Sequence, residues 1–281
     1  MKKIFHYTSL ILFCIIYFSC TEKRVVPIAQ SADVPQDLDY KFDSVPDYVD
    51  EFDYSGIPDP SKWAYDVGAG GWGNQELEYY TAGDNSNVSG GILSINAFKE
   101  SFSGSSYTSS RMVTRGKYDF LYGRIEVRAK LPTGRGLWPA IWLLSSDNSY
   151  GVWPASGEID IMEQVGFDPL NIHFSVHNNT YNGAKGNAKT ANFIVSTATS
   201  DFHNYRVDWT PYSIKGFIDD EQYFEYINEG RGFTTWPYDK KFYLLLNLAV
   251  GGTWGGANGV DNSVFPATMQ VDYVKIYKLL Q

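Results

Sequence analysis

The chain has 281 residues and a formal net charge of −9, which leaves room for one large domain or two modest ones. Loss of Lys2 and Lys3 with an N-terminal leader would lower this charge by two, to −11. The sequence has no basic cluster of the kind that binds nucleic acid, and an acidic surface suits a neutral substrate. Aromatic residues make up 16% of the chain and Gly is frequent, which favours an all-β domain.

Residues 1–19 have the pattern of a secretory signal peptide, with a positive start and an apolar run over residues 10–18. That run is too short to span a membrane as a helix. Cys20 follows at a position that resembles the lipidated Cys of bacterial lipoproteins. We therefore expect export and lipid anchoring to the bacterial outer membrane, on either its outer or its periplasmic side. The alternative is an ordinary signal peptide that is cleaved nearby.

Both cysteines, Cys14 and Cys20, lie in or next to this leader, so we expect no disulfide in the mature domain. Residues 20–48 contain Pro, Asp and Ser without clear periodicity, and we interpret them as a tether that leads into the fold. Residues 49–281 show no composition break, repeat or second linker. We assign them to one domain.

Within that domain the hydrophobic pattern has a period of two. Residues 124–131 alternate polar and apolar side chains, which predicts a half-exposed strand. Residues 243–250 are nearly all apolar, as in a strand buried on both sides, and residues 270–279 predict a closing strand. No long segment has helical periodicity. Many strands with two apolar faces favour a sandwich of two antiparallel sheets.

The motif GEIDIMEQVG, residues 157–166, places three carboxylates among large apolar side chains. On a regular strand Glu158 and Asp160 share one face, whereas Glu163, five positions after Glu158, points to the other. One β-bulge at Ile161 and Met162 would restore the parity and return Glu163 to the face of Glu158. The alternative is an amphipathic strand whose acidic face is solvated.

Two carboxyl groups on one face of a sheet can cleave a glycosidic bond. In the retaining mechanism one is a nucleophile and the other an acid and then a base, with about 5–5.5 Å between the carboxyls. Neighbouring like charges raise each other's pKa, which helps to keep a proton on the acid. Trp138, Trp142 and Trp153 lie nearby in the sequence and could stack on sugar rings, although each could equally be a core residue.

These segments resemble glycoside hydrolase family 16, in particular its bacterial laminarinase-like β-glucanases, over nearly all of residues 50–281. GEIDIME carries the family's acidic signature in its bulged form. Four further blocks occur in the family's order: GGWGNQELEYYT from residue 70, GRGLWPAIWLL from 134, NLAVGGTWGG from 247 and VDYVKIY from 271. The resemblance implies an all-β, concanavalin A-like β-jelly-roll sandwich of two antiparallel sheets with a concave substrate cleft.

The resemblance also implies roles for individual residues in a retaining endo-hydrolase. Glu158 is the expected nucleophile, Glu163 the general acid/base, and Asp160 the residue that supports Glu158. The residues expected to bind sugar are Asn74, Arg111, Trp138, Trp142, Trp153, His177 and Trp254. For His177 and the Trp residues, a place in the core is the alternative.

A structural calcium ion is the one metal that the resemblance implies. Its expected ligands are the Asp272 carboxylate and the backbone carbonyls of Glu51 and Gly91, and oxygen ligands of this kind suit calcium. Alternatively, Asp272 forms only local contacts. Catalysis itself is expected to need no cofactor, and no Cys or His cluster has metal-ligand spacing.

The expected partner is a β-glucan polysaccharide or oligosaccharide, with β-1,3 and mixed β-1,3/1,4 linkages left open. We expect a monomer that binds no nucleic acid and meets a membrane only through its lipid anchor. Three alternatives remain. One is a glycan-binding module without activity on the same sandwich, another is a surface interaction protein whose aromatic residues lie in the core, and the third is a galactan-directed hydrolase of the same family. The absence of a basic cluster for sulfate weakens the galactan alternative.

Overall fold

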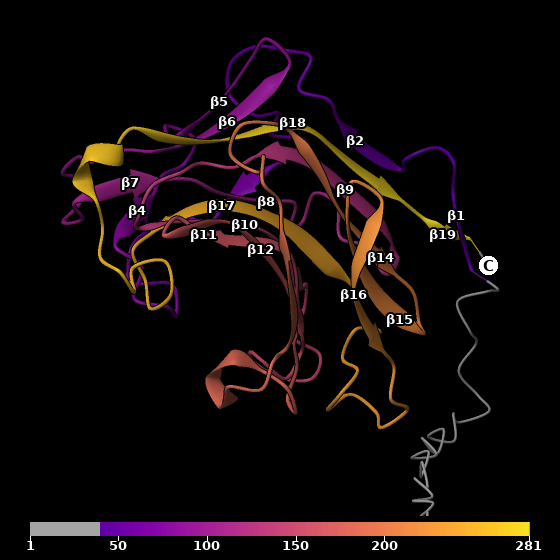
Figure 1. Ribbon diagram of the computed structural model, residues 1–281. Helices are drawn as coiled ribbons and strands as arrows, with labels where there is room; N and C mark the ends of the chain where they lie inside the picture. The colour runs from indigo at the N-terminus through magenta and orange to yellow at the C-terminus, as the bar shows by residue number, and fades with distance from the viewer. Residues whose placement is uncertain (1–39, 281) are drawn as a thin grey trace, which may run out of the picture. The chain divides into compact units, whose positions relative to one another are not determined.

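The computed structural model describes residues 40–280, which form two large, curved β-sheets packed face to face (Figure 1). The seven-stranded sheet has the order β13 (Lys189–Ile194), β12 (Asp168–His177), β11 (Glu158–Val165), β10 (Leu137–Ser145), β17 (Phe242–Val250), β8 (Arg111–Val113) and β3 (Ala64–Tyr65). The eight-stranded sheet has the order β16 (Glu221–Ile227), β15 (Ser213–Ile218), β14 (His203–Trp209), β9 (Gly123–Lys130), β18 (Ala267–Tyr277), β6 (Ile92–Ala97) and β5 (Ser86–Ser89), with β2 (Tyr48–Asp50) also paired to β18.

The smaller elements complete the described part of the chain. A parallel pair joins β4 (Glu78–Tyr80) to β7 (Tyr107–Ser109), and an antiparallel pair joins β1 (Lys41–Phe42) to β19 (Leu279–Leu280). The helical elements within residues 40–280 are the single 3-10 turns η2 (Gly183–Lys185) and η3 (Asn262–Val264). None of them is long or apolar enough to cross a bilayer. The expected all-β jelly-roll sandwich is confirmed, and its neighbouring strands in both large sheets are antiparallel.

The alternation of side chains explains how the two sheets pack. Along β9 every second residue is buried, as predicted for residues 124–131, and Ile125 and Val127 lie wholly inside. They belong to one continuous core with Ile141 and Leu143 of β10, in the opposite sheet. All nine residues of β17 are buried. Alternate side chains such as Leu244 and Leu246 enter the core between the sheets, and Tyr243 and Leu245 on the other face pack in a second cluster with Val113.

The folded unit begins earlier than the sequence suggested. Lys41 and Phe42 were assigned to the tether, but they pair with Leu280 and Leu279 at the other end of the chain. Tyr48, the last residue of the assigned tether, is part of the core. A two-residue strand has too little pattern to be recognised from sequence, and its pairing partner lies far away in the chain. The proposed leader, Cys20 and residues 20–39 lie outside the described residues.

Candidate active site

A β-bulge on β11 brings the three acids of GEIDIME to one face, as predicted. Asp160 lies opposite Trp142 on β10 and Ser175 on β12, while Glu163 lies opposite Ala140 and His173. Three steps along β11 therefore correspond to two steps along each neighbour. The extra residue leaves both Ile161 and Met162 fully buried in the core. Glu163 consequently returns to the side of Glu158 and Asp160.

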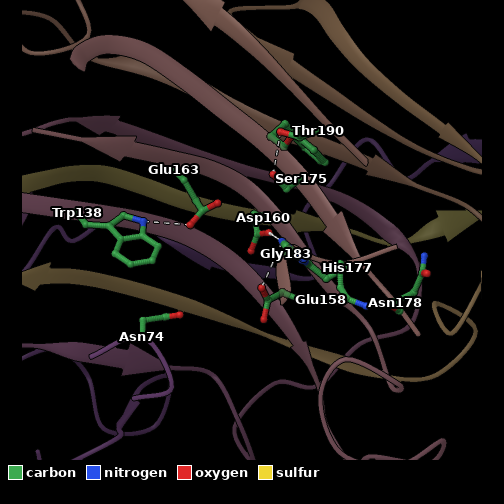
Figure 2. A network of polar contacts seen from close by, with 12 residues as sticks. Asn74, Trp138, Glu158, Asp160, Glu163, Ser175, His177, Asn178, Gly183 and Thr190 are labelled. Atoms are coloured by element: carbon green, nitrogen blue, oxygen red, sulfur yellow. Dashed lines mark hydrogen bonds and ion pairs between the residues drawn. The ribbon is translucent and has the colours of Figure 1, made fainter. Parts of the chain in front are cut away.

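These carboxyls open into a cavity of about 1000 Å³ over the outer, concave face of the seven-stranded sheet. Every residue that was expected to act in catalysis or sugar binding lines this cavity: Asn74, Arg111, Trp138, Trp142, Trp153, Glu158, Asp160, Glu163, His177 and Trp254. The lining extends from Arg111 on β8 to Thr190 on β13, so the cleft crosses the sheet with β11 in its middle part. Figure 2 shows the three carboxyls facing the same space.

His177 fixes the orientation of Asp160. The backbone N–H of Gly183 donates to His177 Nδ1 at 3.0 Å, so Nδ1 carries no proton and the proton of the neutral ring is on Nε2. His177 Nε2 lies 3.0 Å from Asp160 Oδ2 and 3.8 Å from Glu158 Oε1 (Figure 2). This is a close contact between the ring and the carboxyl. Asp160 also accepts a hydrogen bond from the Glu158 carboxyl, so these two acids share a proton.

Trp138 makes the corresponding contact with Glu163. Its indole N–H donates to Glu163 Oε1 at 3.0 Å (Figure 2). The Trp138 ring meets Trp254 edge to face at 5.5 Å, and Trp254 in turn meets the His173 ring at 4.9 Å. His173 lies opposite Glu163 on β12, so the three rings form one connected group next to this acid. Trp138 was expected to bind sugar, and its side chain also positions the Glu163 carboxyl.

Burial raises the pKa of all three acids. The pKa of Glu158 is well above its usual value because of desolvation, and the charge of Asp160 adds to the effect. Burial raises the pKa of Asp160 to about 8, against the hydrogen bond from Glu158. The pKa of Glu163 is also raised to about 8, mainly by burial and next by the charge of Asp160, while the Trp138 N–H opposes the rise. At neutral pH the site therefore retains protons.

On the β8 side of the cleft an Arg lies between two indole rings. The Arg111 guanidinium carbon is 4.8 Å from the ring centre of Trp72 and 4.7 Å from that of Trp142. Arg111 Nε pairs with Asp66 at 3.1 Å, which holds the guanidinium in place. Such a flat, amphipathic stack suits the alternating apolar faces and hydroxyl edges of sugars.

The cleft residues that sequence reasoning missed include Trp72, Glu76, His173 and Asn247. Trp72 and Glu76 lie in the same short block as Asn74, but nothing in their spacing separates them from core residues. Asn247 had a signal, because it is the only polar side chain in the apolar strand β17. Its Oδ1 accepts from the Trp142 indole at 2.7 Å, which positions that ring.

The residues expected to bind calcium lie on the other sheet. Asp272 occupies an irregular position of β18, where this strand changes partner from β6 at Val271 to β2 at Val274. Glu51 directly follows β2 and Gly91 directly precedes β6, so the topology brings both toward Asp272. The three donors are oxygens, which fits calcium. One Asp272 oxygen pairs with Arg128 at 2.5 Å, and the Glu51 side chain pairs with Lys275.

Comparison with known proteins decides the family of this site. The sequence model of glycosyl hydrolases family 16 matches residues 73–275, which include every acid of β11 and most of both sheets. The chain belongs to glycosyl hydrolases family 16. It is therefore a glycoside hydrolase, and the bulged acidic strand is the centre of a family 16 cleft.

Relatives of this family 16 enzyme cover nearly the whole folded unit. A β-glucanase from Rhodothermus marinus is 51% identical over 243 residues, 83% of this chain and 85% of that protein. The structure of the laminarinase from Rhodothermus marinus has a TM-score of 0.84 at 49% identity, covering 86% of this chain and 99% of the other. A variant of SCLam, a non-specific endo-β-1,3(4)-glucanase crystallised with 1,3-β-D-cellotriosyl-glucose, has a TM-score of 0.80 at 42% identity over 87% and 96%.

Proposed function

We propose that this family 16 enzyme is a retaining endo-β-glucanase that hydrolyses β-1,3-linked or mixed β-1,3/1,4-linked glucans. The observation that carries the proposal is the row of Glu158, Asp160 and Glu163 on β11, which opens partway along a cleft that crosses the sheet. A chain of sugars can extend on both sides of the acids, as internal cleavage requires. The similarity to a β-glucanase and a laminarinase supports the substrate class.

In the first step Glu163 acts as the acid and Glu158 as the nucleophile. With Trp138 bound to Oε1, the proton of Glu163 is on Oε2, from which it passes to the glycosidic oxygen. The Glu158 carboxylate attacks the anomeric carbon as the bond to the leaving sugar breaks, and a glycosyl ester forms. For this attack Asp160 takes the proton that it shares with Glu158, so that Glu158 is a carboxylate, and His177 Nε2 lies 3.0 Å from Asp160 Oδ2.

In the second step a water molecule replaces the leaving sugar. Glu163, now a carboxylate, takes a proton from the water as its oxygen attacks the anomeric carbon, and the ester bond to Glu158 breaks. The product keeps its anomeric configuration because two displacements have occurred. Glu163 has regained its proton and Glu158 its charge, so the site is restored.

Substitution of the two glutamates tests these roles. Glu158→Gln should abolish glucan hydrolysis while glycan binding survives, because the ring contacts of the cleft are unchanged. For Glu163→Ala, activated substrates with good leaving groups should lose much less activity than laminarin, since they need no proton. Reducing-end release and binding are measured side by side. Near-normal turnover of the Glu158→Gln variant would refute the nucleophile assignment.

The same assays distinguish the alternatives. A glycan-binding module would bind laminarin or barley glucan and release no reducing ends, and a galactan-directed hydrolase would release them from galactan alone. Chain lengths of the products from laminarin, lichenan and barley glucan would separate β-1,3 from mixed-linkage preference. No release from any β-glucan would overturn the glucanase proposal.

We also propose that Asp272, with the backbone carbonyls of Glu51 and Gly91, holds a structural calcium ion. The ion would join β18 to the ends of β2 and β6, and it would take no part in the chemistry. Calcium added to chelator-treated protein should raise Tm for the wild type and leave Tm of the Asp272→Ala variant unchanged. Equal melting temperatures of the wild type with and without calcium would contradict this.

We further propose that the protein is exported and anchored by a lipid on Cys20. The support is the order of charged, apolar and Cys residues over positions 1–20. In a bacterial host the Cys20→Ser variant should leave the membrane fraction, whereas the wild type should remain there and incorporate labelled fatty acid. Absence of label from the wild type would leave an ordinary signal peptide as the explanation.

A further inference from the structure

Behind the wall of the cleft lies a pair of carboxyl groups that the hydrolytic steps do not use. Glu78 on β4 is completely buried, and Glu76 just before it is nearly so, with its side chain at the edge of the cleft. The two carboxyl groups are close enough to each other for a hydrogen bond. Two carboxylates cannot form such a bond unless one of them carries a proton.

The remaining contacts show which group carries it. Both oxygens of Glu76 accept from other donors: Oε1 from Asn74 Nδ2 at 3.1 Å and Oε2 from the Tyr80 hydroxyl at 2.9 Å. Glu78 Oε2 accepts from the backbone N–H of Val250 at 2.7 Å, whereas Oε1 is buried with no other donor among the described residues. A proton on Glu78 Oε1 satisfies that atom and gives Glu76 its third donor.

This pair is connected to two sugar-binding positions. One connection is direct, from Glu76 to the Asn74 side chain. The other passes from Glu76 through the Tyr80 hydroxyl to Asn247 Nδ2 at 3.1 Å, and Asn247 Oδ1 accepts from the Trp142 indole at 2.7 Å. Trp142 stacks on Arg111 in the cleft. The hydrogen bonds thus run from a buried acid to both Asn74 and Trp142.

We propose that Glu76 and Glu78 share one proton, held on Glu78, and that this pair positions Asn74 and Trp142 for sugar binding. Loss of the proton leaves two adjacent buried carboxylates, which repel each other. Glu76 is then the group that moves, because the cleft gives it access to water. Its movement breaks the hydrogen bonds from Asn74 and Tyr80 to Glu76. The side chains of Asn74 and Trp142 are then no longer held in position. Glu78 is therefore a positioning residue, and it touches no sugar.

The charged and titratable groups around the pair agree with this assignment. Tyr80 shares β4 with Glu78, Arg111 approaches from β8, and Glu163 faces Glu76 from β11 across the cleft. Burial raises the pKa of Glu78 well above its usual value, and the charge of Glu76 raises it further. The pKa of Tyr80 is raised in the same way, so its hydroxyl keeps the proton that it donates to Glu76.

The Glu78→Gln variant tests the shared proton. Its amide can donate to Glu76 in place of the carboxylic acid, and it remains neutral at every pH. The wild-type KM for laminari-oligosaccharides should rise by about fivefold from neutral to alkaline pH, which corresponds to the loss of one hydrogen bond. The KM of Glu78→Gln should stay constant over the same pH range. A wild-type KM that is level across this range, or a Glu78→Gln KM that rises equally, would overturn the proposal.

A matched control and a measurement without substrate complete the test. Glu126 on β9, in the opposite sheet, is a half-buried acid with a raised pKa, so Glu126→Gln should keep the wild-type KM profile. In infrared spectra at neutral pH, Glu78→Gln should lack one protonated-carboxyl band of the wild type. The KM effect rests on the proposed glucanase function, but this band does not. An unchanged band would therefore reject the shared proton by itself.

Discussion

Glu163 shows how a single hydrogen bond can prepare a residue for two opposite tasks. It must give a proton in the first step and take one in the second, so its pKa has to stay near the working pH. Burial raises that pKa to about 8, and the Trp138 N–H limits the rise by binding the charged form better. The same N–H occupies Oε1, so the proton is left on the oxygen that is free to face the substrate.

Replacement of Trp138 by Phe removes this donor and keeps an aromatic ring. The pKa of Glu163 should then rise, so the alkaline limb of kcat/KM should move to higher pH by about one unit, the equivalent of one charge-assisted hydrogen bond. Trp254→Phe is the control, since that ring packs on Trp138 and forms no hydrogen bond with Glu163 in the described structure. An alkaline limb that stays in place in Trp138→Phe would show that the N–H does not tune the acid.

At the scale of the element, β11 depends on one extra residue. The bulge puts Ile161 and Met162 into the core together and turns Glu163 back to the cleft. Without the extra residue the ladder would be regular, since Asp160 and the glutamate would be two positions apart, as their partners Trp142 and Ala140 are on β10. The three acids must point to the same face of this strand, and the bulge is one way to achieve this.

Deletion of Met162 should therefore leave all three acids facing the cleft. The variant should fold with a stability loss of about 2–5 kcal/mol, the cost of removing a large buried side chain, and keep measurable glucan hydrolysis. Deletion of Ile159 is the matched control, because it places Glu158 next to Asp160 and turns one of the two toward the core. Denaturant unfolding and reducing-end assays measure both. A folded but inactive Met162 deletion would mean that the bulge itself shapes the site.

At the scale of the whole molecule, the cleft lowers the stability of the sandwich. Glu158, Asp160 and Glu163 have higher pKa values in the folded state than the value of about 4 expected when unfolded. The folded protein then binds more protons than the unfolded chain between these values. Stability from these groups is greatest below the unfolded pKa and falls as pH rises through about 8.

The Glu163→Gln variant removes one of these titrating groups and should be more stable than the wild type in neutral to alkaline solution. We expect Tm to increase by roughly 2–8 °C at pH 8, with no increase at about pH 2.5, where the wild-type carboxyl is protonated in both states. Thermal unfolding at the two pH values measures this. An equal gain at both would show that the effect comes from packing and not from charge.

Much of the fold could be predicted because its information is local. Alternation predicted β9, a continuous apolar run predicted β17, and the odd offset of Glu163 predicted the bulge. The first strand could not be found in this way, since Lys41 and Phe42 become a strand only by pairing with residues at the far end of the chain. Two-residue pairings carry no pattern of their own.

The sequence by itself determined the sandwich, the acidic row and part of the cleft lining, because period-two patterns and short motifs record which face each side chain occupies. Only the tertiary structure decided how those side chains share protons and donors. The contacts of Trp138 with Glu163, of His177 with Asp160 and of Trp142 with Asn247 join strands that lie apart in the sequence. Hydrogen-bond partners and burial are properties of the packed state, and they set the pKa values on which the chemistry depends.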